Sequence, residues 1–464
     1  MRIIQIAPWT TTAIAAGCIC LSACDAKKEL LDPQQPNTIV PGSVQSQAAA
    51  DELYTGAISR WKSSMNGGGG NTEALWNWEA LFTDELHSAD TFSQRNDADQ
   101  RNLQTNDGVL TPIYRAAQQA RGRARDAINA LVKFDTSALG RQHIGEMYAQ
   151  MGYIEMAMSG VFCNGIPFGE TVNGIPQYTV PLTDADGTKL AMARLDTALL
   201  YLSGPGVAAV SGTSTITNLI LVTRARAQVD LGLFDAAAAT VASVPTNFQY
   251  NFTYSITTFD NEWWVMGPSV KRYTAGDSVD IAGRIFNAIP FAELNDPRVS
   301  VTNTGKGSED NTTIFVQVNN WGRDDPIPVA SGIDARLIQA EDSLHLGNIT
   351  GMMTILNALR TSAQTIGIFK VPAMAALPTP ADAASARALF FREKALWQYE
   401  RGYRMDDLRR LVRQYGLAQD QVFPSGTFTR NGAPSGPYGS QVAFPVVDDE
   451  KSNPNFHGCI DTKA

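Results

Sequence analysis

Charge is scarce in this sequence. Asp, Glu, Lys and Arg make up 18% of the 464 residues, below the roughly 25% of typical soluble proteins. The formal net charge is −9, and Lys and Arg form no block along the chain. A protein that binds nucleic acid usually presents a basic face to the phosphates. The composition therefore predicts no nucleic-acid partner.

Motifs for catalysis and metal binding are also missing. The four histidines are scattered, and the sequence has no HExxH, CxxC, GxSxG or phosphate-binding loop. Asp84, Glu85 and Asp90 crowd one predicted helix, but Asp84 and Glu85 are neighbours that project at different angles, unlike the opposed carboxylates of a glycosidase. We expect these three on a solvated helix face. The sequence predicts no catalytic residue, no metal, no cofactor and no enzyme activity.

Long hydrophobic runs are absent beyond the N-terminus. The apolar run from Ala13 to Leu21 is shorter than the roughly 20 residues that span a bilayer, but it suits a secretory signal. It ends in Leu21-Ser22-Ala23-Cys24, which resembles the bacterial lipobox. Residues 1–23 are therefore predicted to be a lipoprotein signal peptide, with Cys24 as the lipid-modified first residue. The alternative is an ordinary signal with a chance cysteine. Residues 24–45, with three prolines, are expected to form an extended tether.

The length of the chain predicts two or three domains by default, and the residue pattern beyond the tether is mainly helical. Helical periodicity fills about 46–245 and 331–415, whereas 246–330 and 416–464 are rich in loops. Loops of this length inside a compact protein are usually functional or disordered, and the aromatic residues within them argue against disorder.

Two features of the helical part indicate stacked helix pairs. Residues 112–131 carry a stripe of small side chains, which lets helix backbones approach closely. The segment 231–234 (Leu-Gly-Leu-Phe), followed by Ala237, matches the hinge of a tetratricopeptide repeat. The hinge pattern recurs loosely at 346–349. The methionines between 147 and 158 repeat a helical spacing and are expected in the core rather than at a cofactor.

Aromatic residues gather in or near the predicted loops. Sugars present apolar C–H faces and ring hydroxyls, so aromatic platforms beside Asn, Asp or Arg suit them. Trp78 shares an apolar helical face with Leu75, Phe82 and Leu86 and is expected in the core, whereas Trp76 points about 100° away. Of Trp263 and Trp264, one should be buried and the other exposed. The candidate glycan-binding residues are Asn71, Trp76, Trp263, Trp264 and Trp321.

The chain as a whole resembles the SusD/RagB family of outer-membrane nutrient-binding lipoproteins. The resemblance runs from Cys24 to nearly the last residue, and it rests on the order and spacing of several short segments. These are Leu110-Thr-Pro-Ile-Tyr114, Gly145-Glu146 through Tyr153 to Gly165-Ile166-Pro167, Asp296-Pro297-Arg298, Arg336 to Asp342, Ile355 to Arg360, Gly402-Tyr403-Arg404, Phe444-Pro445 and Asn453-Pro454-Asn455.

The resemblance implies that residues 46–464 form a single, mainly α domain with little β structure, in which a tetratricopeptide-like helical scaffold carries long ligand-facing loops. It also implies a non-catalytic, cell-surface lipoprotein that is anchored in the outer membrane by its lipid, with the body facing outward. Such a protein captures an oligosaccharide, a polysaccharide or, in some members, a peptide. It then delivers the nutrient to a SusC-like, TonB-dependent barrel transporter.

The sequence departs from the family pattern at the end of the helical part. Arg401 stands where the family usually has Glu, and Lys394 and Trp397 replace a common Arg and a common Glu. We expect these positions to be structural, with charges pairing between stacked helices.

Two cysteines lie beyond the lipobox, Cys163 and Cys459. An exported protein can join two such residues in a disulfide, which would here link the C-terminal tail to the middle of the scaffold. The alternative is two unrelated thiols.

Two other functions stay open on the sequence alone. A surface-tethered glycan-degrading enzyme would share the tether, the aromatic residues and the carboxylates. A tetratricopeptide scaffold for other proteins would have no affinity for glycans.

Overall fold

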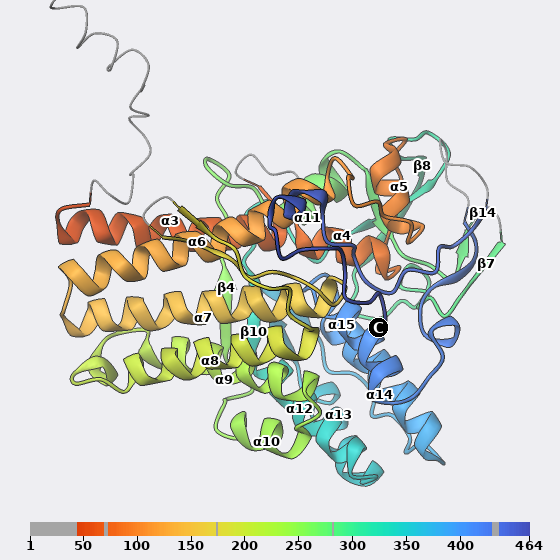
Figure 1. Ribbon diagram of the computed structural model, residues 1–464. Coiled ribbons are helices and arrows are strands. Elements are labelled where there is room, and N and C mark those ends of the chain that lie inside the picture. The colour runs from red at the N-terminus through yellow and green to blue at the C-terminus, as the bar shows by residue number, and fades with distance from the viewer. Residues whose placement is uncertain (1–43, 69–72, 173–174, 281–282, 429–435) are drawn as a thin grey trace, which may run out of the picture.

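A stack of long helices forms one side of the molecule (Figure 1). The computed structural model describes residues 44–68, 73–172, 175–280, 283–428 and 436–464, so the predicted signal peptide, Cys24, Asn71 and almost all of the tether lie outside the described residues. The helices of this side, in chain order, are α3 (Gln47–Asn66), α6 (Leu110–Phe134), α7 (Ala138–Val161), α8 (Asp184–Leu202), α9 (Thr213–Asp230) and α10 (Phe234–Thr240), with the short η2 (Val207–Ala209) before α9.

Local capping sets where several of these helices begin. Ser137 precedes α7, and its hydroxyl accepts from the N–H of Gly140 at 3.0 Å. Thr183 precedes α8 and accepts from the N–H of Asp186 at 3.2 Å. Each cap satisfies a backbone donor that the first turn would otherwise leave without a partner.

Small side chains allow the helices to lie close together. Ala124 and Ala127 of α6 are fully buried, as their place in the small-residue stripe predicted. They share an apolar cluster with Ala57 of α3 and with Met147 and Met151 of α7. The methionine stripe is therefore core, as predicted. Because protein interiors are close-packed, this interface has room for alanine but not for a larger side chain.

The two predicted repeat hinges both join pairs of helices. Gly232 lies between α9 and α10, and Gly347 lies between α12 (Gly332–His345) and α13 (Ile349–Arg360). Their φ angles of 76° and 70° fall in the left-handed region, which favours glycine at a helix end. The ring of Phe234 stacks on His345 at 4.2 Å, so the two helix pairs also contact each other.

The segment that follows α10 is built from short strands. β4 pairs with β10, β8 with β9, and β5 with β1 (Leu86–Ser88), all antiparallel. A four-stranded sheet has the order β14-β13-β7-β6, in which β13 is Ser425–Phe428 and β14 is Gly436–Pro437. The elements are β4 (Gln249–Phe252), α11 (Glu262–Trp264), η3 (Val265–Ser269), β5 (Tyr273–Ala275), β6 (Val279–Asp280), β7 (Gly283–Phe286), β8 (Val301–Gly307), β9 (Ile314–Val318) and β10 (Ile327–Ser331).

The helix predicted from the apolar face of Leu75, Trp78, Phe82 and Leu86 is shorter than expected. Helix α4 (Leu75–Phe82) ends before Leu86, which belongs to strand β1 (Leu86–Ser88), and α5 (Ser93–Asp99) follows. Asp84 has a φ of 54°, which breaks the helix. Gly276 makes this turn fit, because a Cβ on it would lie 2.0 Å from the carbonyl oxygen of Asp84. Pairing with β5 therefore overrides the helical periodicity of this stretch.

In the second helical part, residues 331–415, buried charged side chains join the helices. Its last two helices are α14 (Ala383–Trp397) and α15 (Arg404–Arg413). The Lys394 ammonium donates to Glu341 of α12 at 3.2 Å, and Arg410 donates to the same carboxylate at 2.6 Å. Arg401 pairs with the buried Asp334 at 2.6 Å. The charge pairing expected at Lys394 and Arg401 is thus present in the structure.

The remaining elements are short. They are the hairpins β2 (Glu170–Val172) with β3 (Ile175–Gln177) and β11 (Gln364–Ile366) with β12 (Phe369–Val371), then η4 (Gln419–Gln421), β13 (Ser425–Phe428), β14 (Gly436–Pro437) and η5 (Asp448–Ser452).

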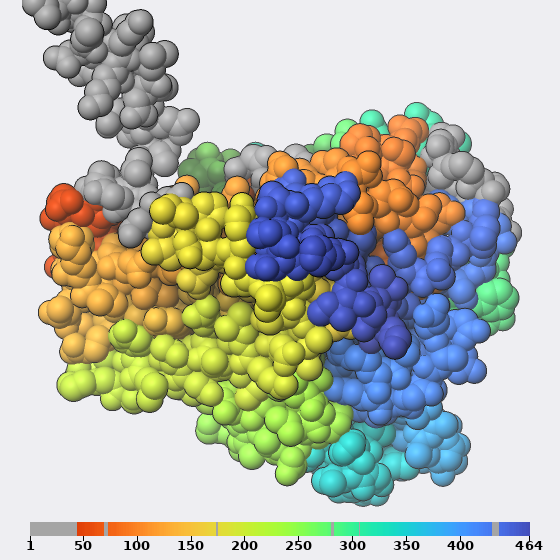
Figure 2. Space-filling view, viewed as in Figure 1, coloured from red at the N-terminus to blue at the C-terminus, as the bar shows by residue number. Residues whose placement is uncertain are grey.

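The C-terminal tail lies against the end of α7. Figure 2 shows the last residues, in dark blue, covering the segment that follows this helix. Cys163 and Cys459 form a disulfide with their Cα atoms 6.0 Å apart, as predicted from their place in an exported chain. The N–H of Ile460 donates to the carbonyl of Asn164 at 2.7 Å beside it. The disulfide joins positions 296 residues apart.

Among the residues that the structure describes, we find no helix with the length and apolar character that crossing a bilayer requires.

Candidate ligand-binding surface

The end of α3 positions the loop that follows β4. Helix α3 ends at Asn66, and Gly67 caps it by donating its N–H to the carbonyl of Ser63 at 3.0 Å. The buried Asn66 amide donates to the Tyr254 hydroxyl at 2.8 Å and to Asn261 Oδ1 at 3.2 Å. These bonds hold both ends of the loop against α3.

Asn261 connects this loop to a third segment. Its side-chain oxygen caps α11 by accepting from the N–H of Trp263 at 3.1 Å. Its backbone N–H donates to the carbonyl of Arg323 at 2.8 Å, and its Nδ2 donates to the carbonyl of Asp325 at 3.1 Å. The end of α3, the loop that follows β4 and residues 323–325 therefore meet around one asparagine.

Trp264, Arg323 and Asp260 form a partly exposed group at this junction, which we call the Trp264 surface. Arg323 Nε donates to Asp260 Oδ1 at 2.8 Å, and the guanidinium carbon lies 5.3 Å from the centre of the Trp264 ring. The Arg323 and Asp260 side chains keep 46% and 28% of their exposure. An indole, a guanidinium and a carboxylate are thus available together at the surface.

A second cation lies over an aromatic ring beside this group. Lys62 Nζ is 4.0 Å from the centre of the Phe259 ring and donates to the carbonyl of Thr253 at 2.7 Å. Burial lowers the pKa of Lys62. Phe259 is partly exposed and directly precedes Asp260, so the Trp264 surface continues onto this ring.

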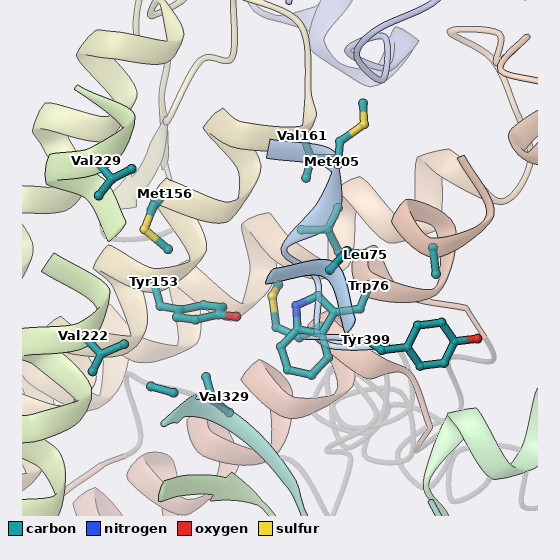
Figure 3. Close-up of a cluster of buried hydrophobic side chains, with 14 of the residues drawn as sticks. Leu75, Trp76, Tyr153, Met156, Val161, Val222, Val229, Val329, Tyr399 and Met405 are labelled. Atoms are coloured by element: carbon teal, nitrogen blue, oxygen red, sulfur yellow. The ribbon is translucent and has the colours of Figure 1, made fainter. Parts of the chain in front are cut away.

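Trp76 is not part of the surface, and the prediction that it forms a platform is wrong. Its side chain is 1% exposed and lies within the main hydrophobic core, 5.6 Å from the ring of Phe252 (Figure 3). A Cβ on Gly402 would come within 2.0 Å of the indole, so the backbone of the second helical part covers the ring. All eight residues of α4 are buried. A direction 100° from the apolar stripe therefore leads into the core and not to solvent.

The other predicted residues divide as follows. Trp263 and Trp321 are each 4% exposed and belong to the core, so neither serves as an exposed platform, whereas Trp264 is partly exposed. One tryptophan of this pair is buried and its neighbour on the short helix α11 is partly exposed, in line with the expectation that the two would differ. Asn71 lies outside the described residues.

The three carboxylates expected on a solvated helix face are buried. Asp84, Glu85 and Asp90 are 0%, 2% and 4% exposed, because the turn after α4 folds beneath β5. Burial raises the pKa of Glu85 to about 8. Asp84 lies with His87 and Asp99 in a group of metal-ligand type, all three of them buried. The sequence pattern could not reveal this group, because its members come from three elements.

A small polar pocket lies between α7, α8 and α15. Its lining includes Asp184, Asp230, Asp406 and Arg413. Asp230 and Asp406 are hydrogen-bonded to each other, and burial together with the Asp406 charge raises the pKa of Asp230. Burial would also raise the pKa of Asp406, but Arg410 and this hydrogen bond lower it. The pocket lining contains no aromatic side chain, so the Trp264 surface is the better candidate for a sugar.

Sequence reasoning missed Arg323, Asp260, Phe259 and Lys62. Phe259 and Asp260 lie within two residues of Asn261, which the sequence had placed beside the tryptophan pair. Arg323 lies two residues after Trp321. Proximity to these aromatic residues was the available signal, but only the fold shows which neighbours reach solvent. Lys62, on α3, carried no such signal.

Comparison with solved structures finds close likeness in fold but not in sequence. A SusD-like carbohydrate-binding protein from Bacteroides vulgatus matches with a TM-score of 0.61 at 11% identity, covering 89% of this chain and 97% of that one. A SusD-like carbohydrate-binding protein from Bacteroides fragilis gives 0.62 at 12%, covering 89% and 99%. The surface glycan-binding protein A from Bacteroides uniformis gives 0.62 at 14%, also covering 89% and 99%.

No protein-family model and no curated protein sequence matches the chain. The likeness instead spans nearly the whole length of each solved structure. The mainly α, tetratricopeptide-like architecture predicted from the sequence is confirmed. The chain has the SusD-like fold.

Proposed function

We propose that the chain is a member of the SusD/RagB family and a non-catalytic glycan-binding protein of the cell surface. It captures an oligosaccharide or polysaccharide and delivers it to a TonB-dependent outer-membrane transporter of the SusC type. The printed descriptions of structures with the same fold include carbohydrate binding and surface glycan binding, which supports the choice of glycan over peptide.

The observation that carries the proposal is the Trp264 surface. A sugar ring stacks its C–H face on an indole, and its hydroxyls are hydrogen-bonded by charged planar groups at the edge. Arg323 donates to Asp260 through Nε and keeps N–H groups of its Nη atoms for a ligand, and the Asp260 carboxylate is an acceptor beside Trp264. Their mutual ion pair is exposed and therefore of little value to stability, which leaves ligand contact as the reason for its placement.

The location of the protein is part of the same proposal. Cleavage before Cys24 and acylation of its thiol would anchor the chain in the outer membrane, and each buried CH₂ of an acyl chain contributes about 0.8 kcal/mol to membrane binding. The tether of residues 24–45 would let the body move above the transporter while the lipid holds it nearby.

Binding is tested by a glycan array on the mature protein, followed by calorimetry with the best glycan. We expect Trp264→Ala to weaken binding about tenfold or more, equivalent to about 1.4 kcal/mol. Tyr178→Ala is the matched control, since Tyr178 is also an exposed aromatic residue, at 49%, but lies outside the Trp264 surface. Equal affinities for the wild type and Trp264→Ala would place the site elsewhere, and binding of peptides in place of every glycan would reject the glycan proposal.

The absence of catalysis is tested separately. Incubation of the wild type with each bound polysaccharide is expected to produce no new reducing ends. Hydrolysis that disappears on substitution of one carboxylate, such as Asp260→Asn, would show that the protein is a glycan-degrading enzyme instead.

The anchor and the transporter need measurements in cells. Cys24→Ala should abolish incorporation of labelled palmitate and release the protein from the outer membrane. Purification of the wild type from membranes should recover a barrel transporter whose gene adjoins that of this chain. Recovery of the protein alone after crosslinking would count against the partnership without affecting glycan binding.

A further inference from the structure

The hairpin of β2 and β3 and the residues after it carry a group of exposed apolar side chains, which we call the hairpin surface. It consists of Val172, Ile175, Tyr178 and Val180. Each of the four keeps between 47% and 64% of its exposure. The sequence contains no charged residue from Thr171 to Thr183. Single exposed apolar residues are ordinary, but several together without charges among them mark a surface that meets another apolar surface.

Contacts at its base hold the hairpin in place. Arg125 of α6 donates to the carbonyl of Thr171 at 2.6 Å and pairs with Glu170 at 3.2 Å. The Asn453 amide of the C-terminal tail donates to the carbonyl of Thr179 at 2.9 Å. Figure 2 shows this part of the chain, in yellow, beside the tail, in dark blue. Because the backbone is already held, little conformational entropy is lost when a partner covers the hairpin surface.

The described chain begins beside the same turn of α6. Val44 is 4% exposed and lies in the apolar cluster that contains Ala124 and Ile128. Arg125, which holds the hairpin, lies between these two residues on α6. The predicted tether therefore joins the body near the hairpin. The 20 residues from 24 to 43 span at most about 70 Å, so a lipid at the start of the tether keeps this side of the body close to the bilayer.

The side chains of the hairpin surface suit a bilayer better than a protein partner. Val172 and Ile175 are paired across the hairpin, so their side chains lie on the same face. Aliphatic side chains enter the boundary between headgroups and acyl chains, and a tyrosine ring lies there with its hydroxyl in water. A protein interface usually adds a polar rim, whereas the charged side chains at the base, Arg125 and Glu170, already pair with each other.

We propose that the hairpin surface rests on the lipid bilayer in which the chain is anchored, and that it orients the body on the membrane. Its partner is the boundary between headgroups and acyl chains rather than a particular lipid. This contact rests on the anchor proposed at Cys24, because four apolar side chains are too few to hold the protein on a membrane alone. The acyl chains provide the affinity, and the tether makes the second contact intramolecular. Glycan binding at the Trp264 surface does not depend on this contact.

The position of the hairpin is measured on vesicles with the full mature chain. Cys24→Ala carries a histidine tag at its N-terminus, which binds nickel-chelating lipids in phosphatidylcholine vesicles and replaces the acyl anchor. Gln177→Cys, at the end of β3, carries an NBD fluorophore. On vesicles its emission should rise about twofold or more over that in buffer, and nitroxide-labelled lipids should quench it, because the fluorophore enters an apolar layer. Leu346→Cys, at a residue 69% exposed between α12 and α13, is the matched control and should show neither change.

A second variant tests the apolar side chains themselves. Ile175→Ser should reduce the quenching at position 177 to less than about half, while the contacts of Arg125 and Asn453 keep the hairpin folded. Equal quenching at positions 177 and 346, no quenching at either, or no effect of Ile175→Ser would overturn the proposal.

A protein partner and the anchor are distinguished in the same system. Shielding of the fluorophore at position 177 only when a barrel transporter is added to the vesicles would also overturn the proposal, because a protein would then cover the hairpin. The tag replaces the acyl group, so none of these outcomes depends on acylation of Cys24 in cells. The palmitate measurement described above tests the anchor separately.

Discussion

Among the helices of residues 47–240, apolar packing is prominent beside the buried Arg121–Glu155 pair of α6 and α7, whereas in the C-terminal part, residues 383–464, buried arginines join distant segments. In the first, α6 packs on α3 and α7 through alanine and methionine side chains. In the second, α15 buries Arg404, Arg409 and Arg410. The Arg409 Nη1 donates to the carbonyls of Ser159, Gly160 and Phe162 at 3.0, 2.9 and 2.9 Å, and so caps the far end of α7.

The contrast concerns sequence distance as much as polarity. Helices of the first region contact the next helices along the chain. Residues of the second region reach back about 250 to 340 positions: Arg409 contacts Ser159, and Tyr114 donates to Glu450 at 2.8 Å across 336 residues. The C-terminal part therefore closes a scaffold that local contacts have already arranged.

Removing the disulfide is expected to have the largest effect on that closure. Replacing Cys163 and Cys459 together by alanine opens a loop of 296 residues, which the chain-entropy model values at about 5 kcal/mol of unfolding free energy. Urea unfolding of the variant and of the reduced wild type should give the same loss. A loss below about 1 kcal/mol would mean that the polar contacts alone secure the tail.

Breaking the buried ion cluster should be nearly as damaging. Glu341→Ala removes one of the two carboxylates that Lys394 and Arg410 share and leaves both on Asp407. Breaking a buried ion pair typically costs about 3–5 kcal/mol, so with Asp407 retained we expect a loss of about 3 kcal/mol. Urea unfolding measures this loss. Asp186→Ala, which removes an exposed pair with Lys189, is the control and should change stability by less than about 1 kcal/mol. Equal effects of the two variants would refute the contrast between the two regions.

Acid should weaken the C-terminal part through the same carboxylate. Burial would raise the pKa of Glu341, but Arg410 and Lys394 outweigh it and hold the pKa at about 2, below its unfolded value of about 4.3. The folded state is then favoured above the unfolded pKa, and this contribution is lost as the pH falls toward 2. We expect on the order of 2 kcal/mol to be lost between pH 7 and pH 3. Unfolding at several pH values measures the slope, which should be shallower in Glu341→Gln.

Overpacking the helical scaffold should produce the smallest of these losses. Ala124→Leu adds three carbons to the fully buried interface of α6 with α3 and α7, which typically costs about 1–3 kcal/mol. Asn129→Leu, at an exposed position of the same helix, should leave the Tm nearly unchanged. A stable Ala124→Leu protein would show that the scaffold helices are less closely packed than their small residues indicate.

The same contrast explains which sequence predictions held. The small-residue stripe, the methionine stripe and the hinge glycines were predictable because each depends on neighbours within one or two helices. Trp76 and Asp84 were misplaced because both are covered by residues far along the chain, Gly402 and Gly276 respectively. A charged side chain on a predicted helix is usually solvated, and the sequence offered no sign that the distant strand β5 would bury Asp84.

Residue type alone did not identify the candidate ligand-binding surface. The sequence identified the aromatic segments, and the fold brings those of Trp264 and Trp321 together around Asn261. Only the tertiary structure decided that Trp264 stays partly exposed while Trp76, Trp263 and Trp321 are buried. Exposure depends on what packs over a side chain, and here that covering comes from other parts of the chain.

The sequence by itself determined, through its repeating helical pattern, that this is a mainly α protein of stacked helix pairs, and it shows two cysteines beyond the N-terminal segment. Periodicity of 3.6 residues and glycine at helix ends are local properties, so they can be read along the chain. The tertiary structure decided which charges are buried, how Cys459 meets Cys163, and that Asp84, His87 and Asp99 come together. Those outcomes depend on contacts between distant segments, whose burial no local pattern encodes.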